Sequence, residues 1–212
     1  MLARDMHGWV WQGEFGMLRS FDGSIVEANA AARALTRAIS AAGFQEVADV
    51  VPGARTVLVS LVPGREPSPG LQELIDTTPA QEAARIGRLH IVVVVYDGPD
   101  VEEVAGLLGF GVDGVAALHS SVEYTVAFIG FQPGFPYLTG LPRELQLPRL
   151  ATPRARVPAG SVAIAGEFTG IYPSPTPGGW RLIGRTEETL FDATAASPSR
   201  FAAGHRVRFV PA

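Results

Sequence analysis

The chain has 212 residues, 47% of them hydrophobic, which is enough to bury about 70% of the unfolded surface in one or two domains. A net charge of −4 gives no overall basic surface, so nucleic acid is not an expected partner, and the absence of cysteine excludes disulfides and thiolate chemistry. No signal segment opens the sequence and its longest apolar run, 91–96, is far shorter than the about 20 residues that cross a bilayer, so we expect a cytoplasmic protein without membrane attachment.

The N-terminal part of the chain predicts a small α+β unit. Residues 9–18 are typical of a strand or a tight hairpin around Gly13. Ser24 and Glu27 form a capping-box pattern that begins a helix, and Gly43 stands where a helix usually ends. The helix between them carries one apolar stripe, made of Leu35, Ile39 and Ala42.

The next segments continue the same alternation of strand and helix. Residues 46–51 and 55–62 predict two strands joined at Pro52-Gly53. Ser68, followed by proline, predicts the start of a helix, and residues 78–87 predict a second short one.

Residues 89–96, LHIVVVVY, are β-branched or apolar on both faces, which favours a central strand covered on both sides. This strand has two possible places. It completes a βαββαβ unit with the preceding elements, or it begins a second domain.

Beyond this strand, two short helices precede a region that is almost entirely β. Asp100 and Glu103 form a second capping-box pattern for a helix that runs to Leu108, and Asp113 is placed to cap another that ends at about His119. The expected strands that follow are 124–131, 161–165, 170–172, 180–184 and 205–210.

Motifs for several common chemistries are missing from the sequence. It contains no Walker-type phosphate loop, no G-x-G-x-x-G after a strand, no H-E-x-x-H and no G-x-S-x-G. The four histidines are not spaced as metal ligands, so we predict no metal site.

One histidine and two arginines are candidate catalytic residues. The imidazole of His119 titrates near neutrality and suits a general acid or base, or it bonds the last carbonyls of its helix and does no chemistry. Arg154 and Arg156, with Arg149 upstream, are spaced so that an extended segment points the pair to one face. Such a pair suits a carboxylate or phosphate; the alternative is a charged, solvated edge strand.

Glycine, proline and aromatic residues frame the same region of the chain. Glycine lets the backbone approach a ligand and aromatic rings can wall a pocket, although the same residues can also close barrel corners and fill a core. The predicted substrate-binding residues are Phe131, Pro133, Gly134, Tyr137, Glu167, Gly178, Gly179 and Trp180.

Three strings in this region carry a family resemblance: GFQPGFPYL (130–138), TPRARVPAGSVAIAGEFTGIYPSPTPGGWRLIGRT (152–186) and LFD (190–192). They resemble the KipI/PxpB family, described as allophanate hydrolase subunit 1-like or as the B-type subunit of 5-oxoprolinase. The resemblance is long and specific from about Tyr124 to Asp192 and weaker toward the N-terminus. The run LHSSVEYTV places His119 where the family also carries histidine.

The resemblance implies an α+β fold in two domains. A small two-layer α/β N-terminal domain, residues 1–88, is followed by a cyclophilin-like β-barrel domain, residues 89–212. On this interpretation the strand 89–96 opens the second domain.

The resemblance also implies a function, as the B-type subunit of an ATP-dependent 5-oxoprolinase that hydrolyses 5-oxo-L-proline to L-glutamate. Amide resonance stabilises the lactam, and phosphorylation of the lactam oxygen would activate it for hydrolysis. In this picture Arg154 and Arg156 would hold the substrate carboxylate or the phosphoryl group, and His119 would move a proton. Since the chain lacks a nucleotide loop, ATP is expected to be bound by, or shared with, a C-type (allophanate hydrolase subunit 2-like) and an A-type (LamB/YcsF-like) subunit. The chain alone should be inactive.

Two other functions stay open on the same resemblance. Some relatives are described as inhibitors that bind a sporulation histidine kinase, a role that needs a complementary surface and no chemistry. A detached piece of a biotin-dependent urea carboxylase would instead require a biotinylated partner.

Overall fold

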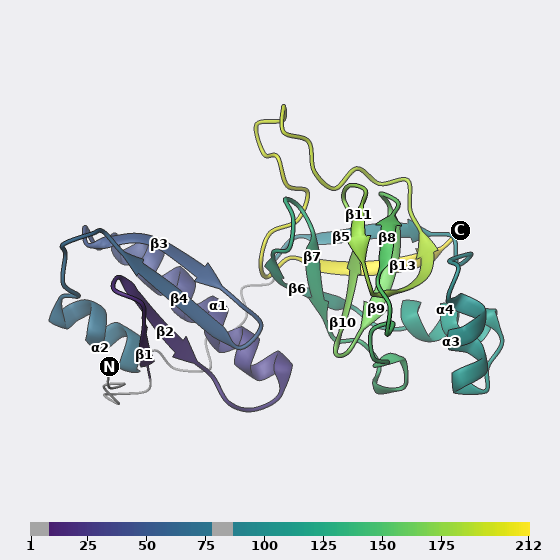
Figure 1. Cartoon of the computed structure of the whole chain (residues 1–212), viewed down its shortest axis with the longest axis horizontal. Helices are drawn as coiled ribbons and strands as arrows, with labels where there is room; N and C mark the ends of the chain where they lie inside the picture. Colours follow the sequence, from purple (N-terminus) through teal and green to yellow (C-terminus); the bar gives the residue numbers. More distant parts are fainter. Residues whose placement is uncertain (1–8, 78–86) are drawn as a thin grey trace. The chain divides into compact units, whose positions relative to one another are not determined.

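The computed structural model of the protein describes residues 9–77 and 87–212 (Figure 1). The chain forms two compact units, Met1–Arg85 and Ile86–Ala212. Of the short helix expected over 78–87, all but the last position lies outside the described residues. No helix in the described ranges has the length and apolar character needed to cross a bilayer.

The first unit contains a four-stranded antiparallel sheet in the order β1-β2-β4-β3. Its strands are β1 (Trp9–Gln12), β2 (Gly16–Ser20), β3 (Val47–Pro52) and β4 (Thr56–Leu61). The expected hairpin around Gly13 is confirmed: β1 and β2 pair directly, and Gly13 adopts a left-handed φ of 65° in the turn.

Two helices, α1 (Ile25–Ala42) and α2 (Pro69–Thr77), complete this unit. The predicted capping box of α1 is present, because the Ser24 Oγ accepts the Glu27 N–H while the Glu27 carboxylate accepts the Ser24 N–H. Gly43 ends the helix in the left-handed conformation, as expected.

The core of the first unit joins both helices to one face of the sheet, which makes it a two-layer α/β unit. Its buried side chains are Met17, Ala32, Leu35, Ile39, Val57, Val59, Leu61, Leu71 and Ile75. The apolar stripe of α1 is therefore confirmed at Leu35 and Ile39, whereas Ala42, the last residue of the helix, is exposed.

The second unit is built on a seven-stranded sheet in the order β12-β9-β10-β7-β6-β13-β5. Its strands are β5 (Leu89–Val94), β6 (Tyr124–Ile129), β7 (Pro136–Thr139), β9 (Ser161–Ala165), β10 (Phe168–Ile171), β12 (Arg181–Arg185) and β13 (Arg206–Pro211). The two ends of the sheet meet where Val95 and Arg185 exchange both backbone hydrogen bonds at 2.9 Å. The sheet thus curls into a nearly closed barrel, and the expected α+β fold with a barrel domain is confirmed.

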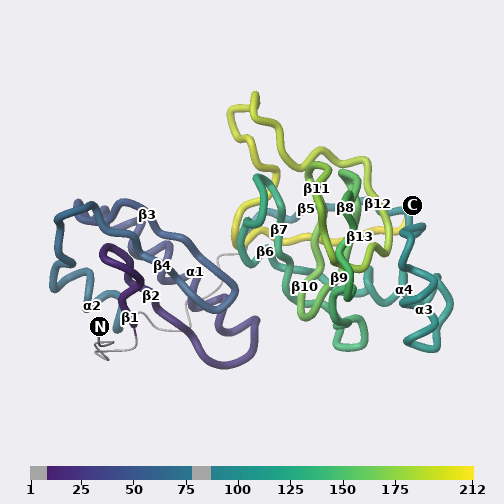
Figure 2. The backbone as a smooth tube through the Cα atoms, viewed as in Figure 1, coloured from purple at the N-terminus to yellow at the C-terminus, as the bar shows by residue number. Residues whose placement is uncertain are grey.

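A two-stranded ribbon, β8 (Arg154–Val157) with β11 (Thr176–Gly178), lies over the β9–β10 part of this barrel (Figures 1 and 2). Three short helices accompany the barrel: α3 (Val101–Leu108), α4 (Val112–Ser120) and the 3-10 turn η1 (Arg143–Leu145).

The strand 89–96 is not central, contrary to expectation. As β5 it belongs to the second unit, where it pairs in parallel with β13 at one end of the sheet order. Its inward residues are buried, but Ile91, Val93 and Val95 are 46%, 47% and 37% exposed. Only one face is covered because, within the described part of the second unit, no layer lies outside this wall of the barrel.

The predicted caps of α3 and α4 are also wrong in detail, although both helices exist. Asp100 occupies the N-cap position of α3, but its side chain makes no capping hydrogen bond. Gly111, not Asp113, is the N-cap of α4, and Asp113 lies within the first turn. The Asp100 carboxylate instead accepts hydrogen bonds from Arg154 and from the Leu182 N–H.

The barrel wall formed by β7, β9 and β10 separates two apolar clusters, because successive strand residues point to opposite faces. The inner cluster includes Leu138, Ile164 and Ile171, which face the barrel interior. The outer cluster, under the ribbon, consists of Phe135, Val157, Ala163, Ala165, Tyr172, Trp180 and Leu182.

Candidate functional site

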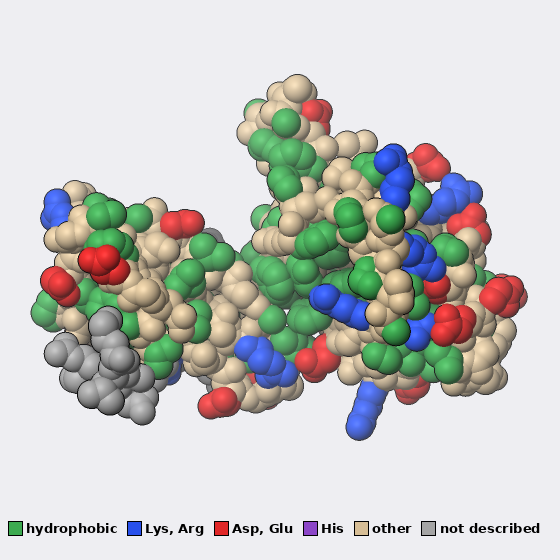
Figure 3. Space-filling view, viewed as in Figure 1, with side chains coloured by type: hydrophobic (Ala, Val, Ile, Leu, Met, Phe, Trp, Pro, Cys, Tyr) green, Lys and Arg blue, Asp and Glu red, His purple; other side chains and the backbone are tan. Residues whose placement is uncertain are grey.

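A cavity of about 280 Å³ opens on the outer face of this wall, beside the β8–β11 ribbon. It is lined by Phe131, Phe135, Tyr137, Arg149, Pro153, Tyr172, Pro177, Gly178, Gly179 and Trp180. On this face of the second unit, hydrophobic side chains gather with positively charged side chains among them (Figure 3). Its size suits a small molecule.

The cavity walls are aromatic rings that hold one another edge to face. Phe135 lies at the centre, with ring centroids 5.1 Å from Tyr137, 5.0 Å from Tyr172 and 5.4 Å from Trp180. Each such contact is worth about 0.5–1.5 kcal/mol beyond the burial of area. The rings therefore support one another without a ligand.

Two glycines are required by the way these rings pack. A Cβ on Gly170 would lie 3.0 Å from Phe135 and 3.1 Å from Trp180, so only glycine lets both rings rest on the strand. A Cβ on Gly178 would lie 2.5 Å from the Tyr172 hydroxyl oxygen. The family-like Pro-Gly-Gly-Trp run thus makes room for a tyrosine hydroxyl at the cavity wall.

Phe131 is held at the edge of the cavity by a strained loop. It is the one non-glycine residue in the described ranges with positive φ, 66°, and it is 60% exposed. The loop is fixed from outside, because Gln132 and Ser174 exchange hydrogen bonds, with the Ser174 hydroxyl donating to the Gln132 side chain at 3.1 Å. Strain that the surroundings maintain is a common feature of binding loops.

Arg149 brings the positive charge of the cavity. Its guanidinium carbon lies 6.0 Å from the Trp180 ring centre, within the range of a cation–π contact. The backbone is fixed on both sides of it: the Leu150 N–H donates to the Gly179 carbonyl at 2.8 Å, and the Pro148 carbonyl accepts from the Arg181 Nε at 3.1 Å. Arg149 is exposed, so its charged end can meet a ligand from solvent.

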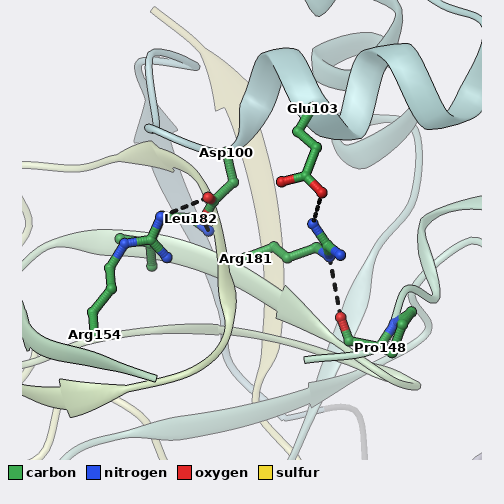
Figure 4. Close-up of polar contacts among 6 residues, drawn as sticks. All are labelled: Asp100, Glu103, Pro148, Arg154, Arg181 and Leu182. Carbon is green, nitrogen blue, oxygen red and sulfur yellow. Dashed lines mark hydrogen bonds and ion pairs between the residues drawn. The ribbon is translucent and has the colours of Figure 1, made fainter. Parts of the chain in front are cut away.

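The first turn of α3 supports this region through two ion pairs (Figure 4). Glu103 pairs with Arg181 at 2.8 Å, which orients the arginine that bonds Pro148. Asp100, only 6% exposed, accepts the Arg154 Nη2 and the Leu182 N–H, each at 2.6 Å. The two acidic residues expected to cap α3 instead tie β8 and β12 to the helix.

Two tyrosine hydroxyls complete the polar lining. Burial raises the pKa of Tyr137 and of Tyr172 above the usual value, so both hydroxyls keep their proton at neutral pH. The Tyr172 oxygen accepts the backbone N–H of Trp180, and its own O–H is a hydrogen-bond donor. The lining therefore offers hydrogen-bond donors and one cation.

The structure brings together five of the eight predicted substrate-binding residues. The five that line the cavity are Phe131, Tyr137, Gly178, Gly179 and Trp180. The other three, Pro133, Gly134 and Glu167, do not line it. Gly134 is left-handed, with φ 80°, and a Cβ there would lie 2.7 Å from the Phe191 side chain, so its role is packing.

His119 does not line this cavity, and the hypothesis that it moves a substrate proton stays a prediction. It is fully buried on the inner side of the barrel wall, where its ring packs against Tyr124 and Phe209. Its Nε2 bonds the Thr169 hydroxyl at 2.9 Å and its Nδ1 bonds the Tyr96 hydroxyl at 2.8 Å.

The protonation of His119 follows from that network. The Thr169 hydroxyl donates to the Ala163 carbonyl, so it accepts from a protonated Nε2, and Nδ1 accepts from Tyr96. Burial lowers the pKa of His119 to about 3. In this structure the imidazole is therefore neutral, is buried from solvent with both nitrogens bonded, and lies apart from the cavity lining.

Arg154 and Arg156 do not enter this cavity as a pair. Arg154 is turned to Asp100, and Arg156 is exposed; neither lines the cavity. The pairing of β8 with β11 shifts register between Thr176 and Gly178, which interrupts the simple alternation behind the prediction. The two guanidiniums and the imidazole therefore do not converge on a common hollow.

Arg149 was not among the binding residues predicted from the sequence. Its position between Pro148 and the TPRARVP string was visible, but only the fold brings it over Trp180. A larger hollow, about 470 Å³, lies where the barrel closes and carries Arg185, Glu187 and Glu188; it has no aromatic wall. No group of three His, Asp or Glu side chains in the described ranges is arranged to hold a metal ion.

A family model and the curated relatives of this chain agree on its family. Residues 9–201 match the family described as carboxyltransferase domain, subdomain C and D. A relative from Escherichia coli O157:H7, named as the B-type subunit of 5-oxoprolinase, is 54% identical over 123 residues, 57% of this chain and 56% of that protein. The chain thus spans about half the length of the curated relatives it matches.

Solved structures agree on the fold. The structure of TTHA0988 matches 93% of this chain and 40% of its own, with a TM-score of 0.82 and 39% identity. The urea amidolyase of K. lactis matches 96% of this chain and 15% of its own with a TM-score of 0.74; at 16% identity it shows the fold alone. The chain belongs to the family of carboxyltransferase domains of the subdomain C and D type, among the KipI/PxpB proteins that its sequence resembles.

Proposed function

We propose that the protein is the B-type subunit of an ATP-dependent 5-oxoprolinase, which hydrolyses 5-oxo-L-proline to L-glutamate together with A- and C-type subunits. The relatives that carry this subunit name, at 47–54% identity, support this role. The single structural observation that carries it is the aromatic cavity, because the family-like strings of the sequence supply most of its walls.

The cavity suits the proposed substrate in size and chemistry. A five-membered lactam with one carboxylate is small enough for about 280 Å³ and has a flat ring that aromatic walls can cover. The tyrosine hydroxyls can donate hydrogen bonds to its oxygens. In this role the chain binds and orients the lactam and excludes water from its ring.

The described lining of this cavity does not suit ATP. A triphosphate needs several positive groups or a backbone loop rich in N–H donors, whereas the cavity offers Arg149 as its one charged lining residue among the described positions. ATP therefore belongs to the partner subunits in this proposal, and the isolated chain performs no turnover.

Reconstitution tests the proposal directly. The chain is co-expressed with A- and C-type subunits, supplied with ATP and 5-oxo-L-proline, and L-glutamate and ADP are measured. We expect both products from the full assembly and neither from the chain alone. An assembly that forms but yields no glutamate refutes the proposal, and turnover by the isolated chain refutes its dependence on partners.

A matched pair of glycine variants ties activity to the cavity. Gly178→Ala forces the Tyr172 hydroxyl out of place, because the new Cβ would lie 2.5 Å from it. We expect activity of the assembly to fall by at least about tenfold, the effect of misplacing one hydrogen-bonding group. Gly106→Ala, on α3 with nothing within 4 Å of the new Cβ, should leave activity unchanged.

A further inference from the structure

The charge distribution in the cavity is one-sided. Arg149 is the one charged residue among the described residues that line it, and none of those lining residues is Asp or Glu. Elsewhere in the second unit, Arg154, Arg181, Arg185 and Arg200 each have an acidic partner. Within residues 9–77 and 87–212, Arg149 makes no such ion pair, so its contact with the Trp180 ring leaves its charge uncompensated.

Hydrogen bonds on both sides of Arg149 fix its backbone position. The neighbouring Pro148 carbonyl and Leu150 N–H are both bonded, the first to Arg181 and the second to Gly179. Arg181 is only 11% exposed and is held by Glu103 at 2.8 Å (Figure 4). Since a binding group costs less entropy when its backbone is already ordered, this arrangement suits recognition of a ligand.

The tyrosines add donors beside the cation. Tyr137 and Tyr172 line the same cavity as Arg149. A guanidinium and hydroxyl donors together match the two oxygens of a carboxylate, while the aromatic rings match an apolar ring.

We infer that the cavity binds a small ring compound with one carboxylate, and that Arg149 is the binding residue for that carboxylate. The ring lies against Tyr137 and Trp180, and Phe131 covers it at the edge. The identity of the natural ligand as 5-oxo-L-proline rests on the proposed function; the ligand class and the role of Arg149 do not.

Calorimetric titration of the full chain tests this inference. The probes are 5-oxo-L-proline, pyrrole-2-carboxylate, and 2-pyrrolidinone, which has the lactam ring but no carboxylate. At least one carboxylate probe should bind, and Arg149→Gln should weaken its binding by about 10- to 100-fold, the loss of one charge-assisted hydrogen-bonded pair. The same variant should not change the affinity for 2-pyrrolidinone.

Two variants serve as controls for this titration. Arg149→Lys keeps the charge without the planar fork and should lose less affinity than Arg149→Gln. Arg143→Gln changes an exposed arginine of η1 that does not line the cavity, and should bind as wild type does. Circular dichroism of each variant establishes that it is folded.

The inference and the proposed function fail in different ways. Failure of both carboxylate probes to bind, or equal loss of carboxylate and 2-pyrrolidinone binding in Arg149→Gln, overturns the inference. An assembly that hydrolyses 5-oxo-L-proline with unchanged KM in Arg149→Gln overturns it too, while the function stands. Arg149-dependent binding of pyrrole-2-carboxylate without any 5-oxoprolinase activity supports the inference and rejects the function.

Discussion

His119 shows how burial decides what a titratable residue can do. The same imidazole that suits acid–base chemistry in water is neutral here, because the barrel interior penalises its charged form and bonds both nitrogens. The groups that face it are the uncharged rings and hydroxyls of Tyr96, Tyr124, Thr169 and Phe209. Its role is to connect α4 to the barrel wall.

This role predicts a pH dependence of stability. The pKa of His119 is lowered from 6.5 to about 3 in the folded state, so the unfolded chain binds one more proton between these values. The contribution of His119 is complete above its unfolded pKa and is lost as pH falls toward the folded one. From pH 8 to pH 5 it should cost about 2 kcal/mol of unfolding free energy.

Urea unfolding of the wild type and of His119→Gln at several pH values measures this contribution. We expect the variant to be less stable at neutral pH, and its stability to fall less steeply below pH 6.5. His90, whose pKa burial lowers to about 4, adds to the slope of both proteins, so the difference isolates His119. Equal slopes in the two proteins would contradict the buried, neutral state.

At the residue scale, the sequence predicted the aromatic and glycine residues of the site better than it predicted which arginine lines the cavity. Aromatic and glycine residues at 131, 137, 178, 179 and 180 were predicted because turn-rich strings confine them to one region. The arginines were not, since a guanidinium on a long side chain takes its direction from partners distant in sequence. Arg154 binds Asp100, which is 54 residues away in the sequence, whereas Arg149 lines the cavity.

At the scale of elements, the start of α3 links the helix to two strands. The Asp100 carboxylate fixes the ribbon through Arg154 and the barrel strand β12 through the Leu182 N–H. A carboxylate that is 6% exposed and accepts two hydrogen bonds holds these elements in register. The cavity wall at Gly178, which pairs with Arg154, is positioned by this contact.

Replacing Asp100 therefore costs more than the loss of a helix cap. Asp100→Ala leaves the Leu182 N–H without its acceptor, and Arg154, 29% exposed, turns partly to solvent. We expect a loss of about 2–3 kcal/mol of unfolding free energy, measured by urea denaturation. Glu102→Ala, exposed in the same turn, should cost under about 1 kcal/mol.

Asp100→Asn separates hydrogen bonding from charge. The amide oxygen still accepts the Leu182 N–H, so this variant should recover most of the stability that Asp100→Ala loses. If Glu102→Ala and Asp100→Ala proved equally destabilising, the bridging role of Asp100 would be wrong.

Elements were predictable where a local pattern determines them. The box of Ser24 and Glu27 is present because both residues lie at an exposed helix start and bond each other there. The same pattern at Asp100 and Glu103 did not form, because arginines distant in sequence compete for both carboxylates. Likewise β5 looked central from its composition, but barrel closure leaves its outer face exposed, and no local pattern reports closure.

At the scale of the whole molecule, the described cavity residues belong to one of the two units. Every described lining residue of the cavity lies in the second unit, between positions 131 and 180. Each unit has its own apolar core, one around α1 and α2 and one inside the barrel. Separate cores predict that the units unfold in separate transitions, and that ligand binding belongs to the second.

The boundary between the units can be tested by where a fragment begins. We propose that the second domain starts by Gly87, ahead of the sequence-based boundary at 88/89. The Arg88 carbonyl accepts the Arg206 N–H at 2.9 Å, and the Gly87 carbonyl accepts the Arg206 Nε at 3.3 Å. A Cβ at Gly87 would collide with the Gly204 carbonyl, so this backbone packs directly on the barrel.

Two fragments distinguish these boundaries in calorimetric unfolding. Residues 87–212 should unfold in one cooperative transition at the temperature of the second-unit transition of the full chain. Residues 89–212 lack both hydrogen bonds to Arg206 and should be less stable by about 1–2 kcal/mol.

A ring carboxylate that binds only the folded second unit stabilises that unit. It should therefore raise the unfolding temperature of the 87–212 fragment and of the matching transition in the full chain. A fragment 87–212 that stays unfolded, or a ligand that shifts the other transition, would show that the site needs the first unit.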